Sequence, residues 1–264
     1  MMLFASTCNQ PLRLKEALEP VRSTLLAKAP VARWGLAYVH SGEVLLSRSP
    51  RQSDVDVDLF AAVAEIASDY VIAHAVAPGM PETEWAGTTN TQPFRFRRWM
   101  FAQEGTIGHY LQVAPQLMEQ VPDYMRRNVK GRTPAELFFH VFLAMLHDLG
   151  SVDDSNLPIA TTRRAVAAAL AIVLDRVTKA GGGEVPGNLV VSNGRSMLAV
   201  RLGGPMYTRR LTVLGPRGDR DESFRGVMVI SGAAHPGEGF EEVPLRSGIA
   251  IGRDLRSDIA PLDG

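Results

Sequence analysis

Side chains able to carry out covalent chemistry are scarce in this chain, because its only cysteine is Cys8. A cysteine attacks as the thiolate, and Cys8 has neither a base nearby in sequence nor a free α-amine to activate it. A free cysteine otherwise behaves as a small buried hydrophobe, and we interpret Cys8 in this way. One cysteine also excludes an internal disulfide and any multi-cysteine zinc or iron–sulfur site. We therefore expect a reducing, cytoplasmic setting and no cofactor.

Three histidines and two aspartates stand where acid–base or metal chemistry is conceivable. His74 follows an apolar run, and we interpret it as a hydrogen-bonded core residue because no nucleophile remains for it to serve. His140 and His147 are seven residues apart on one helical face, a separation too long for both to bind one metal without a third ligand. We interpret them as packed or solvated side chains. Asp153 and Asp154 are expected to cap or solvate the start of a loop.

Residues 90–107 form the stretch around which the chain is organised. They begin with a polar turn that contains Gln92 and a proline, continue as an apolar run with bulky residues over 94–101, and stop at Gly105. This pattern predicts a buried strand that runs into a sharp loop, with any functional site at the strand end. Glu104 stands at that end. A carboxylate beside a small buried cavity is an acid or base with a raised pKa, or else a cap or salt-bridge partner.

The charge balance disfavours nucleic acid and membranes as partners. The chain has 264 residues, with 28 Lys and Arg against 28 Asp and Glu, and zero net charge gives no global field that attracts polyanions. Cations alternate with aromatic side chains from Arg95 to Trp99, and we interpret this run as the solvated face of a strand. No apolar run approaches the ~20 residues of a membrane span, and no secretory signal is recognisable.

Hydrophobic periodicity predicts the elements that must position these side chains. Helices are predicted over residues 12–28, 58–68, 108–121, 133–149 and 161–180. Besides the run in 90–107, strands are predicted over residues 1–6, 34–39, 43–47, 70–76, 188–192, 196–202, 206–214, 227–231 and 248–251. A loop is predicted over residues 78–89. Thr133 is expected to cap the fourth helix, with Glu136 as its capping-box partner.

The order of these elements predicts an α+β fold. Strands at both ends of the sequence, with helices between them, suggest two stacked sheets inside two helical layers. No repeat and no low-complexity linker interrupts the sequence. We therefore expect one domain over residues 1–264, with a core over 1–252 and a tail over 253–264.

Taken in order, these segments resemble the class II glutamine amidotransferases, specifically the small stand-alone branch. The resemblance extends from residue 1 to about residue 251. It is carried by a strand beginning at the second residue, Trp34-Gly35, Ala73-His74, Asn90-Thr91-Gln92-Pro93-Phe94, residues 99–107, residues 131–136 and Ser192-Asn193-Gly194. It implies a four-layer αββα sandwich with the N-terminal nucleophile hydrolase fold, and an active site where the first strand begins.

The sequence departs from this family at the positions that the resemblance assigns to chemistry. Met2 replaces the cysteine nucleophile, and a thioether has no ionisable proton. Val76 replaces an arginine that holds the substrate carboxylate, and Pro134 replaces an aspartate that holds the substrate amine. Glu104 replaces the asparagine of the oxyanion hole, although Gly105 is kept. Loss of one such donor typically costs about 100- to 1000-fold in rate.

Three functions are compatible with this degenerate pocket. The first is a catalytically inactive relative that serves as a protein-binding or regulatory module, with another protein as partner and with residues 78–89 or the pocket mouth as the binding surface. The second is an amidohydrolase or amidotransferase with a rebuilt pocket that uses Glu104. The third is a sensor that binds an amine or cationic metabolite through Glu104. An open polar cavity around Met2, Glu104 and Pro134 would favour a ligand, and a filled one would favour the interaction module.

Overall fold

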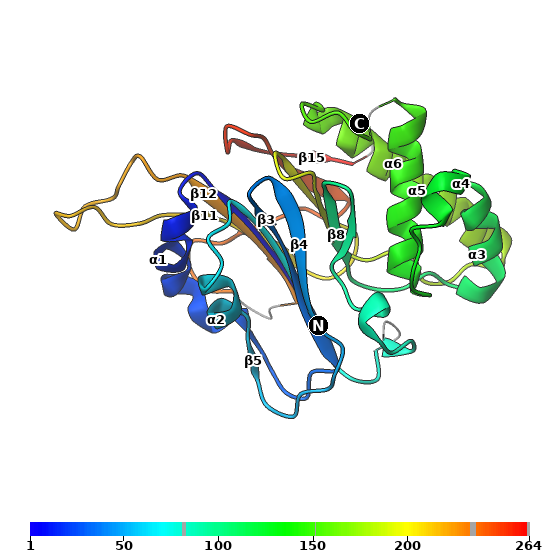
Figure 1. Cartoon of the computed structure of the whole chain (residues 1–264), viewed down its shortest axis with the longest axis horizontal. Helices are drawn as coiled ribbons and strands as arrows, with labels where there is room; N and C mark the ends of the chain where they lie inside the picture. The colour runs from blue at the N-terminus through cyan, green and yellow to red at the C-terminus, as the bar shows by residue number, and fades with distance from the viewer. Residues whose placement is uncertain (81–82, 151, 233–235, 263–264) are drawn as a thin grey trace.

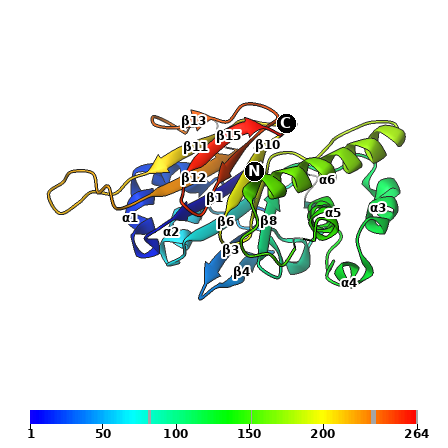
Figure 2. The same cartoon turned by 90° about the horizontal axis from the view of Figure 1, so that it is seen from above.

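The computed structural model describes residues 1–80, 83–150, 152–232 and 236–262. Two β-sheets lie face to face, and helices cover the outer face of each sheet (Figure 1, Figure 2). The four-layer αββα arrangement expected from the sequence is confirmed.

The first sheet has seven strands, and every neighbouring pair is antiparallel. In spatial order the strands are β13 (Glu241–Glu242), β11 (Met206–Leu211), β12 (Gly226–Ser231), β1 (Met2–Cys8), β6 (Tyr70–Val76), β3 (Arg33–His40) and β4 (Glu43–Ser49). All seven residues of the central β1 are buried. Both faces of β1 therefore pack against other layers.

The second sheet has six antiparallel strands, and a two-stranded sheet pairs β2 (Leu26–Ala27) with β5 (Val57–Asp58). The six strands are β15 (Ser257–Pro261), β14 (Ser247–Ile251), β10 (Met197–Arg201), β9 (Leu189–Ser192), β8 (Trp99–Gln103) and β7 (Phe94–Phe96). The strand predicted over 94–101 is thus two strands. Buried aromatics alternate at Phe94 and Phe96 and again at Trp99 and Phe101, but the alternation breaks between the two pairs, where Arg97 has φ 53°. A two-residue turn there makes a hairpin.

The residues expected as a tail contribute β15, which pairs with β14 through Ile249 and Ile259. Residues 257–261 are therefore part of the second sheet. The strand was missed because it lies at the sheet edge and its residues are exposed or half-buried, so its sequence lacks a buried apolar run. Residues 263–264 of the expected tail lie outside the described residues.

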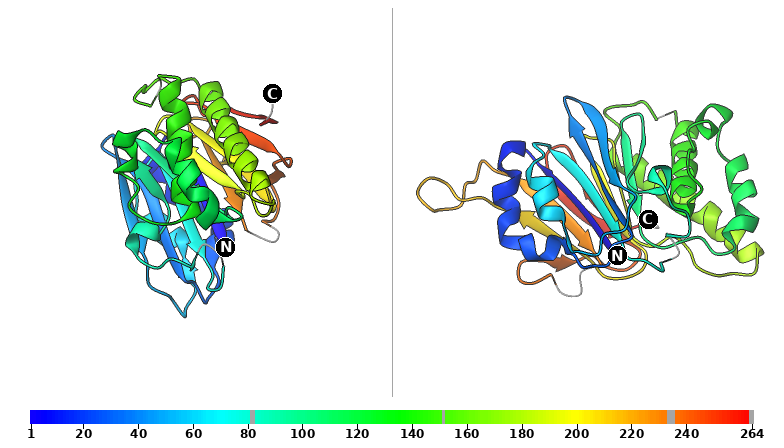
Figure 3. Two further views of the ribbon diagram at one scale, coloured as in Figure 1. Left: turned by 90° about the vertical axis from the view of Figure 1, so that its right-hand side faces the viewer. Right: turned by 60° about the horizontal axis from the view of Figure 1, so that its bottom comes forward.

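One group of helices lies outside the first sheet, and a second group, which includes the two longest helices, lies outside the second sheet (Figure 3). The first group is η1 (Pro11–Arg13), α1 (Leu14–Leu18), η2 (Glu19–Leu25) and α2 (Leu59–Ala64). The second group is α3 (Tyr110–Glu119), α4 (Asp123–Arg126), α5 (Pro134–Asp148) and α6 (Ile159–Lys179). The helix predicted over 12–28 is interrupted, because Pro20 lacks the N–H that an α-helix needs and the chain continues as a 3₁₀-helix.

The loop predicted over 78–89 is irregular where it is described, ends in η4 (Thr88–Asn90), and contains Pro81 and Glu82, which lie outside the described residues. The cap of α5 differs in part from its prediction. Thr133 Oγ1 accepts the N–H of Glu136 (3.3 Å), as an N-cap should. The Glu136 carboxylate, however, accepts N–H groups of Lys130 (2.9 Å) and Gly131 (2.6 Å). It fixes the preceding loop and does not complete a capping box.

Candidate functional site

Antiparallel pairing brings the start of β1 beside the end of β6, so Met2 lies opposite Ala75, and Leu3 lies opposite His74. Met2 is 8% exposed and packs in the apolar cluster between the first sheet and α1 and α2. Ile72 packs between the two sheets, and alternation along β6 places His74 on that side as well. Met2 and His74 therefore occupy adjacent strands but point to opposite faces of the sheet.

A cavity of about 300 Å³ opens at this end of β1. Its lining side chains are apolar except for Lys28, the only charged side chain among the described residues that form it, and polar atoms contribute a substantial part of the lining surface. The lining residues are Met1, Met2, Leu26, Ala27, Lys28, Val31, Ala75, Val76, Ala77 and Gly232. Met2 and Val76 both line this cavity and give it a thioether and an isopropyl group.

His74 is a neutral core residue. Burial lowers the pKa of its imidazole to about 3, and the nearby Arg33 guanidinium lowers it further. Its Nε2 has no hydrogen-bond partner among the described residues. The interpretation of His74 as a core residue agrees with its burial (2% exposed). Arg33 itself donates from Nη1 to the Trp85 carbonyl (2.5 Å).

The Glu104 carboxylate, only 7% exposed, lies in a polar network at the ends of three strands. The Ser231 hydroxyl donates to Glu104 Oε2 (2.6 Å), and Asn188 Nδ2 donates to Ser231 Oγ (2.7 Å). Asn188 Oδ1 accepts the N–H groups of Leu202 (2.9 Å) and Gly203 (3.0 Å). These bonds join the loop after β8 to the end of β12 and the start of β9. Ser231 and Asn188 were not identified from the sequence, because neither stands in a recognisable motif.

The loop that follows Glu104 is held by glycine contacts. Gly105 has φ +80°, which confirms the sharp turn expected there. Gly187 donates its N–H to the Glu104 carbonyl (2.9 Å), and the Glu104 N–H donates to the Asn188 carbonyl (2.7 Å). A Cβ at Gly187 would lie 2.7 Å from the Glu104 carbonyl oxygen. Only a glycine allows this approach of the two backbones.

Gln92 and Pro134 have structural contacts away from the cavity. Gln92 Nε2 donates to the Gln103 carbonyl (2.8 Å), and the Gln103 N–H donates to Gln92 Oε1 (2.7 Å). The Gln92 side-chain amide thus forms the same two hydrogen bonds to the Gln103 backbone that a neighbouring strand would form. Pro134 is buried at the first position of α5. His74, Gln92, Glu104, Gly105 and Pro134 are all absent from the described lining of the cavity at Met2.

The remaining candidates have ordinary packing roles. Cys8 is buried, and burial raises the pKa of its thiol to about 11, so it is a thiol at neutral pH. Burial lowers the pKa of His140, whose Nδ1 lies 2.9 Å from the Glu136 carbonyl. His147 Nδ1 lies 3.1 Å from the Tyr124 hydroxyl. Asp153 forms an ion pair with Arg97 and Asp154 accepts the N–H of Asn156 (2.8 Å). Within the described ranges, no group of three or more His, Cys, Asp or Glu residues could hold a metal ion.

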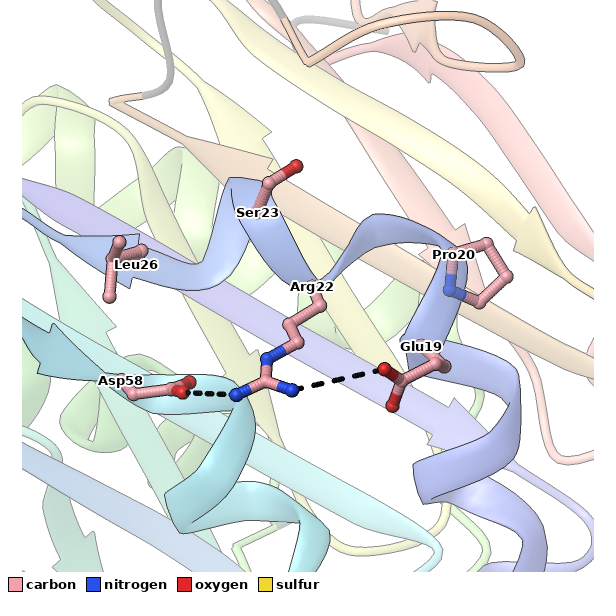
Figure 4. Close-up of a pocket in the computed structure, with 6 residues that line it drawn as sticks. All are labelled: Glu19, Pro20, Arg22, Ser23, Leu26 and Asp58. Carbon is pink, nitrogen blue, oxygen red and sulfur yellow. Dashed lines mark hydrogen bonds and ion pairs between the residues drawn. The ribbon is translucent and has the colours of Figure 1, made fainter.

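A second cavity, of about 440 Å³, lies on the outer surface beside η2. Figure 4 shows the Arg22 guanidinium between Asp58 (3.2 Å) and Glu19 (3.9 Å). The Arg22 side chain is 55% exposed, and ion pairs at such sites contribute little to stability. We assign no chemistry to this cavity.

No family model and no curated protein matches this sequence. Solved structures of similar fold include the glutamine aminotransferase class-II domain protein of Silicibacter pomeroyi, with a TM-score of 0.63, 19% identity and 99% of each chain covered. The predicted glutamine amidotransferase of Pseudomonas aeruginosa has a TM-score of 0.55 and 14% identity, with 97% of this chain and 99% of that chain covered.

The glutamine phosphoribosylpyrophosphate amidotransferase of Bacillus subtilis has a TM-score of 0.58 and 10% identity. The alignment covers 99% of this chain but 49% of that enzyme, so this chain spans about half of its length. The protein thus has the N-terminal nucleophile hydrolase-like fold of class II glutamine amidotransferases. Within the described residues, no helix is both long and apolar enough to cross a membrane.

Proposed function

We propose that this chain is a single cytoplasmic glutamine amidotransferase-like domain that does not hydrolyse glutamine and serves as a protein-binding or regulatory module. The observation that carries the proposal is the hydrogen bond from Ser231 to Glu104 (2.6 Å), backed by Asn188. The buried Glu104 carboxyl group occupies the position where the resemblance places an oxyanion donor. It already accepts a hydrogen bond from the Ser231 hydroxyl. A developing oxyanion there would meet carboxyl oxygens in place of an N–H donor.

The other positions of the site support the same proposal. Amide hydrolysis through a covalent intermediate needs a nucleophile that a base can deprotonate. Met2 offers a thioether, and the neutral His74 points to the opposite face of the sheet. Val76 gives the cavity no positive charge for a substrate carboxylate. The rebuilt-enzyme alternative requires Glu104 to transfer protons, yet its carboxylate is separated from the cavity and bonded to Ser231.

The binding role is tested at the cavity mouth with a charge reversal. Lys28 is 74% exposed on its side chain and lines the mouth, so Lys28→Glu should weaken a partner that docks there. Lys15→Glu, at an exposed residue of α1, is the matched control. Proteins captured on the purified chain are identified and then titrated against all three proteins. The proposal expects a partner whose affinity falls with Lys28→Glu alone, and a partner insensitive to both changes would place the binding surface elsewhere.

A second candidate function is a sensor for a small apolar ligand, and the cavity at Met2 favours it. Its volume of about 300 Å³ and its mostly apolar lining side chains are typical of a small-ligand site. Because Glu104 does not line this cavity, we expect an aliphatic ligand and not the amine or cation that the sequence suggested. Short aliphatic carboxylic acids should raise the melting temperature saturably. Ala77→Trp, which fills the cavity rim, should abolish the rise, and an equal rise in the variant would refute this function.

A further inference from the structure

One side of α6 carries an apolar stripe that the described chain covers only in part: Ala171 and Leu174 are exposed, whereas Ala167 and Leu170 are half-buried beside the core. Ala167, Leu170, Ala171 and Leu174 recur at helical spacing and span about 100° of the helix surface. Leu174 is 47% exposed and Val185, on the next loop, is 41% exposed. The four residues line a groove of about 180 Å³ together with Val185, Pro186, Leu202, Arg246 and Leu262. The buried side of α6 packs against the second sheet and α5.

The stripe reads Ala, Leu, Ala, Leu along the helix, so an antiparallel second stripe places a leucine opposite each alanine. We propose that a second copy of this chain covers the groove, with the two α6 helices antiparallel about a twofold axis between Leu170 and Ala171. In that register Leu170 lies opposite Ala171 of the second copy, and Ala167 lies opposite Leu174 of the second copy. Each leucine therefore meets an alanine, and the two helices can interdigitate without overpacking.

The charges beside the stripe are complementary in the same register. Arg164 and Asp175 lie on one edge of it, seven residues before and four residues after Ala171. When a twofold axis relates two antiparallel helices, the edge of the stripe that carries Arg164 and Asp175 lies beside the same edge of the second copy. Arg164 then lies within two residues, about 3 Å along the axis, of the position opposite Asp175 of the second copy. The symmetry makes this contact twice.

Both charged groups can reach such a partner. Arg164 donates to Thr161 Oγ1 (3.3 Å) and has no ion pair among the described residues. Asp175 pairs with Lys179 (2.8 Å) and Arg176 (3.6 Å) at the exposed surface, and a carboxylate can accept a further donor. A foreign partner would need a charge pattern of its own to match, whereas a second copy supplies the opposite charges automatically. This observation favours a second copy as the occupant.

This inference is independent of the proposed function, because α6 lies in the helical layer outside the second sheet (Figure 2), whereas the cavity at Met2 borders the first sheet. The test is sedimentation equilibrium of the full chain from low micromolar to submillimolar concentration. The wild type should move reversibly from a 28.7 kDa monomer toward twice that mass. Leu174→Glu should remain monomeric. The control Leu214→Glu changes a 62% exposed leucine in the protruding loop between β11 and β12 (Figure 1) and should dimerise like the wild type.

Exchanging the two charges tests whether the two copies pair in this antiparallel register. Arg164→Asp and Asp175→Arg should each weaken dimerisation by roughly 2- to 30-fold, since two exposed ion pairs are lost. The double variant should recover most of the wild-type affinity. A wild type that stays monomeric, a Leu174→Glu variant that still dimerises, or a double variant no better than the single ones would each overturn the proposal. Melting curves equal to that of the wild type confirm that every variant is folded.

Discussion

The Ser231 hydroxyl donates to Oε2 of Glu104 across 2.6 Å and links the end of β12 to the loop after β8. This bond joins the two sheets at the end where the amidotransferase resemblance places an oxyanion hole. The expected position of a reacting group is thus part of the protein's internal packing.

Removing the donor should destabilise the fold. Ser231→Ala removes the hydrogen bond that the buried Glu104 carboxylate accepts and the one that Asn188 Nδ2 donates to Ser231, although Asn188 Nδ2 keeps its bond to the Gly204 carbonyl (2.9 Å). The loss of a hydrogen bond to a buried carboxylate costs about 1–3 kcal/mol. The measurement is urea unfolding of Ser231→Ala beside Ser223→Ala, which removes an exposed hydroxyl. An equal free energy of unfolding for the two variants would contradict a structural role for the buried bond.

Stability should fall on acidification because of His74. Its folded pKa is about 3, against 6.5 as its ordinary value, so the unfolded chain binds the proton more readily. The free energy of unfolding therefore falls as pH decreases below the unfolded pKa, and the loss is complete only at the folded pKa. For this group the loss should be about 2 kcal/mol between roughly pH 7.5 and pH 5.

The measurement is urea unfolding of the wild type and His74→Leu at both pH values. Other titrating groups, including His140, affect both proteins alike, so the difference in slope isolates His74. We expect the variant to lose less stability than the wild type. Parallel pH dependence would mean that His74 is solvated or partnered when folded.

Much of this arrangement follows from the sequence, because β1, β6 and α5 are marked by buried apolar runs and by a threonine cap. The four-layer stacking also follows from the resemblance. The hairpin of β7 and β8 was missed because its turn, at Arg97 and Arg98, contains no glycine, proline or asparagine to mark it. The strand β15 was missed because an edge strand need not be apolar.

The site was only partly predictable. Met2 and Val76 line one cavity, and the other residues assigned to the pocket are absent from its described lining. The partners of Glu104 could not be found, because Ser231 is 127 residues away in sequence and a serine at a strand end has no distinctive pattern. The opposite orientation of Met2 and His74 depends on the register of β1 with β6. Register is a tertiary property that periodicity alone does not give.

The glycine contact beside Glu104 should be sensitive to one added methyl group. Gly187→Ala would place a Cβ 2.7 Å from the Glu104 carbonyl oxygen, so one backbone must move and the hydrogen bond between residues 187 and 104 should weaken. We expect a loss of about 1–3 kcal/mol. Gly204→Ala is the control, since nothing lies within 4 Å of its Cβ position. Equal unfolding free energies would show that the loop accommodates the methyl group.

Cys8 should be unreactive in the folded protein. Burial raises the pKa of its thiol to about 11, and the thiolate is the species that reacts with disulfide reagents. Labelling by a chromogenic aromatic disulfide should be slow in buffer and fast in denaturant. Rapid stoichiometric labelling of the native chain at neutral pH would contradict both its burial and its structural assignment.

The most direct test of the central claim is ammonia release from glutamine and from γ-glutamyl amides by the purified full chain, measured beside Met2→Ala and Glu104→Gln. The account predicts that all three proteins give the rate of buffer alone, because the family's nucleophile position holds a thioether and its oxyanion position holds a carboxylate bonded to Ser231. Hydrolysis by the wild type that Met2→Ala or Glu104→Gln abolishes would contradict it.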